Sequence, residues 1–196
     1  MFLLDFLFPK TPKILELEKL SSQKLLDLLS PHSLPFDYQH PLVKEIIWEI
    51  KYKGNRTLAE KIGMLLYDSI VPELNEEKII LIPIPISGKR RFERGFNQTE
   101  IICEAIKKLD KEGRFKYLCG QLIKTIDTLS QTRTATRKER LENLRDSMVI
   151  LNPEKIKGQC VVLIDDVTTT GATFTEAKRA LRAAGAKKIY CFAIAH

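Results

Sequence analysis

The spacing of apolar residues changes along the chain and predicts alternating helices and strands. Residues 40–53 carry apolar side chains at helical spacing, with Pro41 in the first turn, where proline is tolerated, and Gly54 placed to end the helix. Further helices are expected over residues 57–67, 95–109 and 173–184, the last closed by Gly185.

Three apolar runs, at residues 78–86, 161–164 and 188–195, have the composition of buried strands. Pro83 and Pro85 lie near the end of the first run, so the ladder of sheet hydrogen bonds is expected to stop there. The order strand, helix, strand from residue 161 onward is that of a right-handed βαβ unit. We therefore predict an α/β fold with a mostly parallel sheet flanked by helices.

The remaining segments are patterned more weakly. Leucines in residues 1–38 indicate a short helix or two, interrupted by Pro31 and Pro35. Residues 110–146 are polar and basic, and part of the stretch 128–140 is expected to form a mobile loop. The predicted organisation is an N-terminal appendage of residues 1–39 followed by one domain of residues 40–196.

Composition narrows the class of protein. With 196 residues, 44% hydrophobic and 29% charged, the chain is long enough and apolar enough to bury a core, which argues against disorder. No apolar run approaches the ~20 residues of a membrane span, and the short apolar start contains Asp5, which makes a poor signal peptide. Four scattered cysteines without a Cys-x-x-Cys pair then indicate reduced thiols and a cytoplasmic location without membrane contact.

The net charge of +7 is concentrated in one segment. Residues 89–145 hold 15 basic and 8 acidic side chains, a net of +7, so the rest of the chain is balanced. Such a field attracts polyanions, whether a nucleic acid, a membrane surface or a phosphorylated small molecule, although a well-solvated surface explains it equally well.

The most informative motif is Val-Val-Leu-Ile-Asp-Asp-Val-Thr-Thr-Thr-Gly-Ala-Thr at residues 161–173. An apolar strand leads into Asp165 and Asp166, and a loop of small hydroxyl residues and Gly171 then opens a helix. Backbone N–H groups at a helix N-terminus favour an anion, and glycine permits close approach. Two carboxylates beside such a loop suit a ligand with hydroxyls next to a phosphate, such as ribose 5-phosphate.

Other readings of this motif fit less well. It lacks the spacing and lysine of the nucleoside triphosphate loop, and one glycine is too few for the dinucleotide fingerprint. Helix capping alone would explain a single Asp-Asp pair but not the whole arrangement.

The motif resembles the 5-phospho-α-D-ribose 1-diphosphate (PRPP) signature of the type I phosphoribosyltransferases. The resemblance implies that Asp165 and Asp166 hold the ribose hydroxyls and that a loop holds the 5-phosphate. The loop residues implied are Thr168, Thr169, Thr170, Gly171, Ala172 and Thr173. It also implies a Mg²⁺ ion bound by the substrate's oxygens, with no site formed by the protein alone.

A second constellation, Ile-Pro-Ile-Pro-Ile-Ser-Gly-Lys-Arg-Arg-Phe-Glu-Arg-Gly-Phe-Asn-Gln at residues 82–98, follows the first predicted strand. The turn is expected to bring a group of basic residues to the edge of the sheet at which the 161–173 motif also lies. Guanidinium groups there suit a pyrophosphate. A solvated basic turn is the alternative. The expected pyrophosphate-binding residues are Pro85, Ser87, Lys89, Arg90 and Arg94, with Arg91 nearby.

Together the two constellations resemble the ComF family of competence-associated, phosphoribosyltransferase-like proteins. Supporting segments are Ile-Lys-Tyr-Lys-Gly at 50–54, where Lys51 and Lys53 could face the site, and the block from Gln131 to Asn143. The resemblance places that block in or beside a hood loop, with Arg133, Arg137 and Arg140 closing over the ligand. Many ComF proteins carry an N-terminal four-cysteine zinc ribbon. This chain has no cysteine before Cys103, so we expect that module to be degenerate or missing.

The resemblance implies a type I phosphoribosyltransferase fold and transfer of a phosphoribosyl group with pyrophosphate as the leaving group. Asp165, Asp166 and Arg94 are then the residues expected to act on the substrate, with no histidine nearby to serve as a general base. Two alternatives remain open. One is a non-enzymatic DNA-uptake accessory protein that binds single-stranded DNA or a competence helicase, and the other is a PRPP sensor. A homodimer is also possible.

Overall fold

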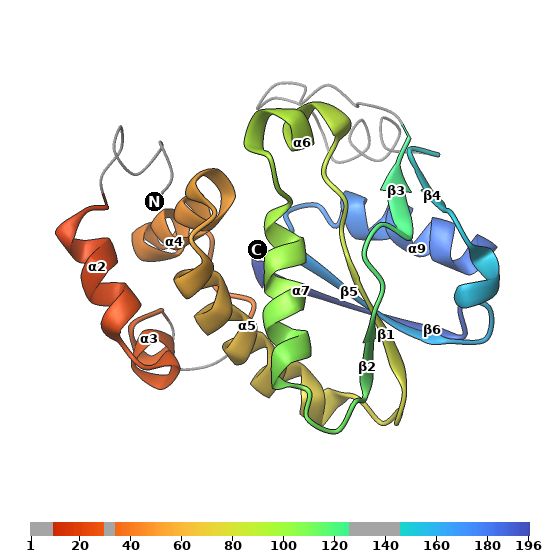
Figure 1. The fold of residues 1–196 in the computed structure, drawn as a ribbon, viewed down its shortest axis with the longest axis horizontal. Coiled ribbons are helices and arrows are strands. Elements are labelled where there is room, and N and C mark those ends of the chain that lie inside the picture. The colour runs from red at the N-terminus through yellow and green to blue at the C-terminus, as the bar shows by residue number, and fades with distance from the viewer. Residues whose placement is uncertain (1–9, 30–33, 126–145) are drawn as a thin grey trace.

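A computed structural model describes residues 10–29, 34–125 and 146–196 (Figure 1). The α-helices are α2 (Pro12–Lys19), α3 (Ser22–Leu29), α4 (Pro41–Lys53), α5 (Arg56–Ile70), α6 (Gly88–Arg94), α7 (Gln98–Leu109) and α9 (Ala172–Ala183). The strands are β1 (Ile79–Pro83), β2 (Phe115–Tyr117), β3 (Leu122–Lys124), β4 (Met148–Ile150), β5 (Cys160–Val167) and β6 (Lys188–Ala195). Two short 3₁₀ helices are η1 (Val71–Glu73) and η2 (Pro153–Lys155).

Four strands form a parallel sheet in the order β2-β1-β5-β6, which confirms the predicted α/β class. β5, α9 and β6 form the predicted strand-helix-strand unit, because β5 and β6 are parallel neighbours in this sheet. β3 and β4 pair separately as an antiparallel ribbon. The carboxyl ends of β1 and β5 lie side by side, since Pro83 is in register with Ile164.

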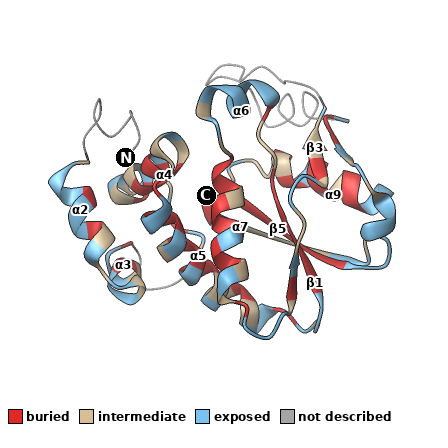
Figure 2. Ribbon diagram, viewed as in Figure 1, coloured by how far each residue is buried: buried red, intermediate tan, exposed pale blue. Residues whose placement is uncertain are grey.

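The two faces of the sheet are covered by different helices (Figure 1). Alternate residues of β1 and β5 face opposite sides, so Leu81 and Val162 pack with α4, α5 and α7, whereas Ile82 and Leu163 pack with α9 and the β3–β4 ribbon. Both faces are buried along these strands (Figure 2), which explains their nearly continuous apolar composition.

The N-terminal helices belong to the larger of these two cores. Ile14 of α2 and Leu25 of α3 are fully buried in the same cluster as residues of α5. Phe36 then adds a short parallel bridge to β6, with its N–H donating to the carbonyl of Ile194 at 2.8 Å. The edge strand β6 is therefore partly covered by the segment that leads into α4.

Within the described ranges, no helix is both long and apolar enough to cross a bilayer. The longest, α5, packs closely on α7. A Cβ atom added at Gly63 of α5 would lie 2.6 Å from that of Ala105 in α7, so glycine is required for this approach. This contact sets the position of α7, whose first turn contributes to the site.

The structure differs from the sequence expectations in three places. The segment after Ser87, expected as a turn, forms the helix α6, because the Ser87 hydroxyl accepts from the Arg90 N–H and Gly95 ends the helix in a left-handed conformation. Residues 110–125, expected without strands, contain β2 and β3. The strand expected at 161–164 extends to Val167, because its pairing with β6 continues through Asp165 and Val167.

Candidate ribose-phosphate site

A cavity of about 260 Å³ lies at the carboxyl ends of β1 and β5. Its wall combines residues from α4, the β1–α6 turn, α7, the β3–β4 ribbon and the start of α9. The lining residues are Lys51, Tyr52, Ile84, Pro85, Ile86, Ser87, Arg90, Arg94, Gln98, Lys124, Met148, Asp165, Asp166, Val167 and Thr173. Ligands of open α/β folds bind at this edge of the sheet.

Two adjacent carboxylates line the cavity. Asp165 and Asp166 are 7% and 6% exposed, at the end of β5. The N–H of Asp166 donates to Oδ1 of Asp165 at 2.8 Å. Burial, and then the neighbouring Asp166 carboxylate, raise the pKa of Asp165 to about 8. Two carboxylates held at one place in a low-dielectric site favour a shared proton and are suited to ribose hydroxyls.

Asp166 is held by two side chains from the helical layer. The Nζ of Lys51 lies 3.1 Å from Oδ1 of Asp166, and Gln98 donates from Nε2 to Oδ2. Lys51 is the next-to-last lysine of α4, and Gln98 is the first residue of α7. Lys51 and Gln98 therefore each contact one carboxylate oxygen of Asp166. A hydroxyl group that binds to Asp166 would have to share these contacts or replace them.

The turn between β1 and α6 is fixed by hydrogen bonds from the start of α7. The carbonyl of Ile84 accepts from Asn97 Nδ2 at 3.0 Å and from the Thr99 hydroxyl at 2.8 Å. Asn97 and Thr99 are almost fully buried. The polar sequence around residue 97 thus has a structural role: it holds the Pro85 turn against the sheet, where the turn forms one wall of the cavity.

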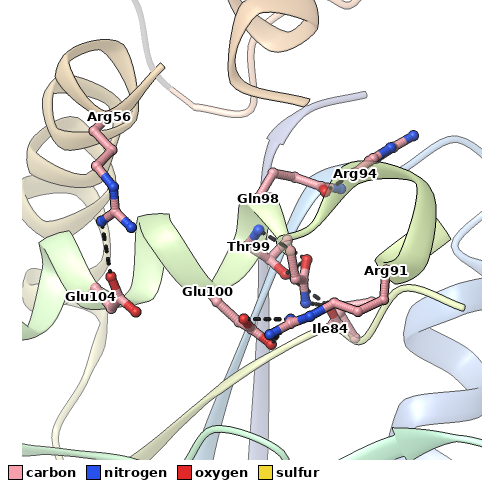
Figure 3. A network of polar contacts seen from close by, with 9 residues as sticks. Arg56, Ile84, Arg91, Arg94, Gln98, Thr99, Glu100 and Glu104 are labelled. Atoms are coloured by element: carbon pink, nitrogen blue, oxygen red, sulfur yellow. Dashed lines mark hydrogen bonds and ion pairs between the residues drawn. The ribbon is translucent and has the colours of Figure 1, made fainter. Parts of the chain in front are cut away.

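The cations of α6 point in different directions (Figure 3). Arg90 and Arg94 line the cavity, and Nη1 of Arg94 also donates to Oε1 of Gln98 at 3.2 Å. Arg91 instead forms an ion pair with Glu100 of α7 at 2.6 Å (Figure 3). Lys89 is exposed and lies 4.0 Å from Glu93, outside the cavity wall. Of the four basic residues, the fold brings two to the cavity.

The segment between β5 and α9 adopts the predicted loop. Gly171 has φ 71°, a left-handed conformation that L-residues rarely adopt, and it directly precedes α9. The N–H of Thr168 donates to the carbonyl of Ala195, so that amide belongs to the sheet. The hydroxyl of Thr170 accepts from the N–H of Ala172 at 3.4 Å, and Thr173 reaches the cavity wall.

The fold thus gathers Pro85, Ser87, Arg90, Arg94, Asp165, Asp166 and Thr173 around one cavity. The described wall of the cavity does not include Lys89. It also does not include residues 168–172, which form the adjoining loop. Arg133, Arg137 and Arg140 lie outside the described residues. Ligand roles for all of these remain predictions.

Sequence reasoning missed several residues of the wall. Tyr52 and Gln98 belong to the segments 50–54 and 82–98 that carry the family resemblance, and their position near basic residues is a usable signal. Lys124 and Met148 belong to the β3–β4 ribbon, and nothing in their local pattern indicates a site. Lys51 does reach the cavity as suggested, whereas Lys53 pairs with Glu49 at 2.9 Å.

The chain is similar in sequence to several known proteins. A family model described as "Phosphoribosyl transferase domain" matches residues 104–196. Competence protein F of Haemophilus influenzae is 24% identical over 79% of this chain and 66% of its own length. Competence protein ComFC of Bacillus subtilis is 25% identical over 71% of this chain and 53% of its own. ComFC of Streptococcus pneumoniae is 29% identical over 83% and 67%.

The chain therefore spans about half to two thirds of the length of these curated relatives. A solved structure, the glutamine PRPP amidotransferase from B. subtilis with ADP and GMP, overlaps with a TM-score of 0.47 at 17% identity, over 74% of this chain and 30% of that chain. This overlap is partial, and it adds nothing to what the strand order and the site residues indicate about the fold.

The parallel sheet, the acidic pair at the end of β5 and the match of residues 104–196 to the family model together indicate a protein of the phosphoribosyltransferase fold. The three relatives named above are competence proteins, and each match is longer than the segment 104–196 that the domain model covers. The chain is therefore similar in sequence to proteins of the ComF family, and its residues 104–196 match the phosphoribosyl transferase domain.

Proposed function

We propose that the cavity binds PRPP and that the protein transfers its phosphoribosyl group to a nitrogenous base. The observation that carries the proposal is the convergence of two buried carboxylates, two arginines and a helix N-terminus on one cavity. The carboxylates suit the ribose hydroxyls, the arginines suit the pyrophosphate, and the start of α9 suits the 5-phosphate.

The chemistry needs no covalent intermediate on the protein. The bond from ribose C1 to the pyrophosphate oxygen breaks, a bond from C1 to the acceptor nitrogen forms, and the acceptor proton passes to solvent. Arg90 and Arg94 would stabilise the charge of the departing pyrophosphate. Asp165 and Asp166 would orient the ribose so that C1 faces the acceptor.

Magnesium enters this proposal as part of the substrate. The described residues contain no group of three or more histidine, cysteine, aspartate or glutamate side chains placed to hold a metal ion. The acidic pair offers two carboxylates next to the place of the ribose hydroxyls, so the protein residues fit a magnesium–PRPP complex in which substrate oxygens and water supply the other ligands.

The test combines binding and turnover. PRPP is titrated by calorimetry with and without magnesium, and pyrophosphate release is assayed in the same samples with a panel of bases. Magnesium-dependent binding with base-dependent release is the expected result. Binding without release in any sample would favour the PRPP sensor, and the absence of binding would contradict the proposal.

One observation favours a second candidate, the binding of single-stranded DNA. Phe92 of α6 is 92% exposed among Lys89, Arg90 and Arg91, which is the combination of a stacking ring and cations that single strands use. Of the other aromatics in the basic segment, Phe115 is buried in the core, and Phe96 and Tyr117 are packed against it. Relatives from Escherichia coli carry the name "DNA utilization protein YhgH".

The second candidate is tested with a fluorescently labelled oligothymidylate and the Phe92→Ala variant. Stacking of one base predicts about a tenfold loss of affinity, and the affinity should fall steeply with salt. Equal affinity of the variant and the unchanged chain would remove the support that Phe92 gives.

A further inference from the structure

We propose that Trp48 and Tyr52 of α4 form a stacking platform for the base of a nucleotide whose ribose phosphate occupies the cavity. The positions of the ribose and the phosphate follow from the proposed function. The platform is inferred from other contacts, which play no part in that proposal. The expected ligand class is a nucleoside 5′-monophosphate, which is the product that the proposed transfer would form.

The platform is a row of two adjacent rings with a cation at each end. The ring centroids of Trp48 and Tyr52 lie 5.6 Å apart. Arg94 covers Tyr52, with its Cζ 4.7 Å from the ring centroid, and Nζ of Lys53 lies 5.3 Å from the centroid of Trp48. The two aromatic residues nevertheless remain 48% and 49% exposed, so large apolar faces are left in water.

The row is continuous with the cavity. Tyr52 and Arg94 line the same wall as Asp165 and Asp166. Lys51 lies between the two aromatic residues in sequence, and its ion pair with Asp166 holds this turn of α4 over the acidic pair. A base attached to a ribose held by the carboxylates would therefore lie in a cavity that has the Tyr52 ring in its wall.

The chemistry of the wall favours stacking over hydrogen-bond recognition of the base. Among the residues that the structure describes, no histidine lines the cavity, and the amide of Gln98 is engaged by Asp166 and Arg94. Every nucleobase has a π-face, so a platform of rings flanked by cations binds bases with little selectivity. The plain alternative is that an i,i+4 aromatic pair only stabilises the surface of α4.

Trp48 is the only tryptophan of the chain, so its fluorescence reports directly on the platform. AMP, ribose 5-phosphate and adenosine are titrated separately, with calorimetry in parallel. We expect AMP to quench Trp48 and to bind about five- to a hundredfold more tightly than ribose 5-phosphate. In Tyr52→Ala this preference, the ratio of the two affinities measured on the same variant, should fall to less than twofold.

Two variants complete the design. Tyr52→Phe keeps the ring and should retain the preference for AMP. Tyr190→Ala is the matched control, because Tyr190 also lies under a lysine, with Nζ of Lys188 4.5 Å from its ring centroid, but on β6 and outside the cavity wall. It should retain the preference as well.

The outcomes separate this inference from the proposed function. Equal affinity for AMP and ribose 5-phosphate, or a preference that Tyr52→Ala leaves intact, would overturn the platform while the ribose-phosphate site stands. Quenching by adenosine without binding of ribose 5-phosphate would support the platform and contradict the proposed function. Quenching by oligothymidylate alone would overturn the inference in favour of a single-strand site, and no binding of any ligand would overturn both.

Discussion

Nζ of Lys51 lies 3.1 Å from Oδ1 of Asp166, and this ion pair joins the end of α4 to the end of β5. The side chains are 20% and 8% exposed, so the contact is mostly shielded from water. Because Asp165 is adjacent, the lysine supplies positive charge to a buried place where two carboxylates meet. The pair thereby connects the N-terminal helices to the site, and it makes α4 part of the cavity wall.

Lys51→Met tests the structural role of this pair. The variant leaves Asp166 without its cation, so the free energy of unfolding should fall by about 1–3 kcal/mol. Urea unfolding measures the change. Lys44→Met is the matched control, because Lys44 is an exposed lysine on the same helix, and its loss should change stability by less than ~0.5 kcal/mol. Equal effects of the two variants would show that the pair contributes nothing.

Asp165 makes stability depend on pH. Its pKa is raised to about 8 from 3.8, first by burial and then by Asp166, so between these values the folded chain holds a proton that the unfolded chain has released. The free energy of unfolding therefore falls as pH rises through this window. Asp165→Asn removes this dependence and keeps the acceptor for the Asp166 N–H.

Near pH 4 the variant should have the same free energy of unfolding as the unchanged chain. At pH 7 its free energy of unfolding should be higher by an amount on the order of 1–4 kcal/mol. Urea unfolding at pH 4, 6 and 8 checks this. Two stability curves that run parallel across the whole range would contradict the assigned pKa shift.

Gly171 is expected to matter for phosphate binding beyond its effect on stability. Its φ of 71° strains any L-residue, so Gly171→Ala should lose about 1–2 kcal/mol of stability. Gly113 has φ 68° in a distant turn, and Gly113→Ala should lose a similar amount. We expect only the Gly171 variant to weaken the binding of ribose 5-phosphate, by tenfold or more, measured by calorimetry. A loss shared by both variants would point to general instability.

The two directions taken by the α6 arginines predict a contrast in pyrophosphate binding. Arg90 lines the cavity, so Arg90→Met should weaken the binding of inorganic pyrophosphate about ten- to a hundredfold, the value of one or more charge-assisted hydrogen bonds. Arg91 pairs with Glu100, so Arg91→Met should leave the affinity within twofold. Titration at a fixed, low ionic strength compares them. Similar losses would mean that only the general positive charge matters.

The long periodic elements could be predicted from the sequence, because their patterns extend over several turns or a whole strand. The α4 pattern with Pro41 and Gly54 is an example, and the helix ends as expected in a left-handed Gly54. The short elements could not. β2, β3 and β4 have three residues each, too few to show a period, and their positions depend on pairing with distant segments.

The helix α6 was missed for a different reason. It has seven residues and buries none of them, so it has no apolar face to reveal it. Its only signals are the capping Ser87 and the terminal Gly95. This omission affected the site, because the helical turn is what separates Arg91 from Arg90 and Arg94.

The acidic pair and its loop could be predicted, because the chemistry lies within thirteen consecutive residues. The contacts that Lys51 and Gln98 make with Asp166 could not, since they join three elements that are far apart in sequence. Local patterns thus locate the candidate ligand groups, whereas the charge balance around them depends on the tertiary fold.

Calorimetric titration of ribose 5-phosphate into the unchanged chain and into the Asp165→Asn, Asp166→Asn double variant tests whether this acidic pair forms a ribose-phosphate site. Circular dichroism and urea unfolding establish that the variant is folded. We predict saturable binding to the unchanged chain and at least a hundredfold weaker binding to the variant, because the variant loses the carboxylate of Asp166 and the carboxyl group of Asp165 as partners for the ribose hydroxyls. Unchanged affinity in a folded double variant would contradict it.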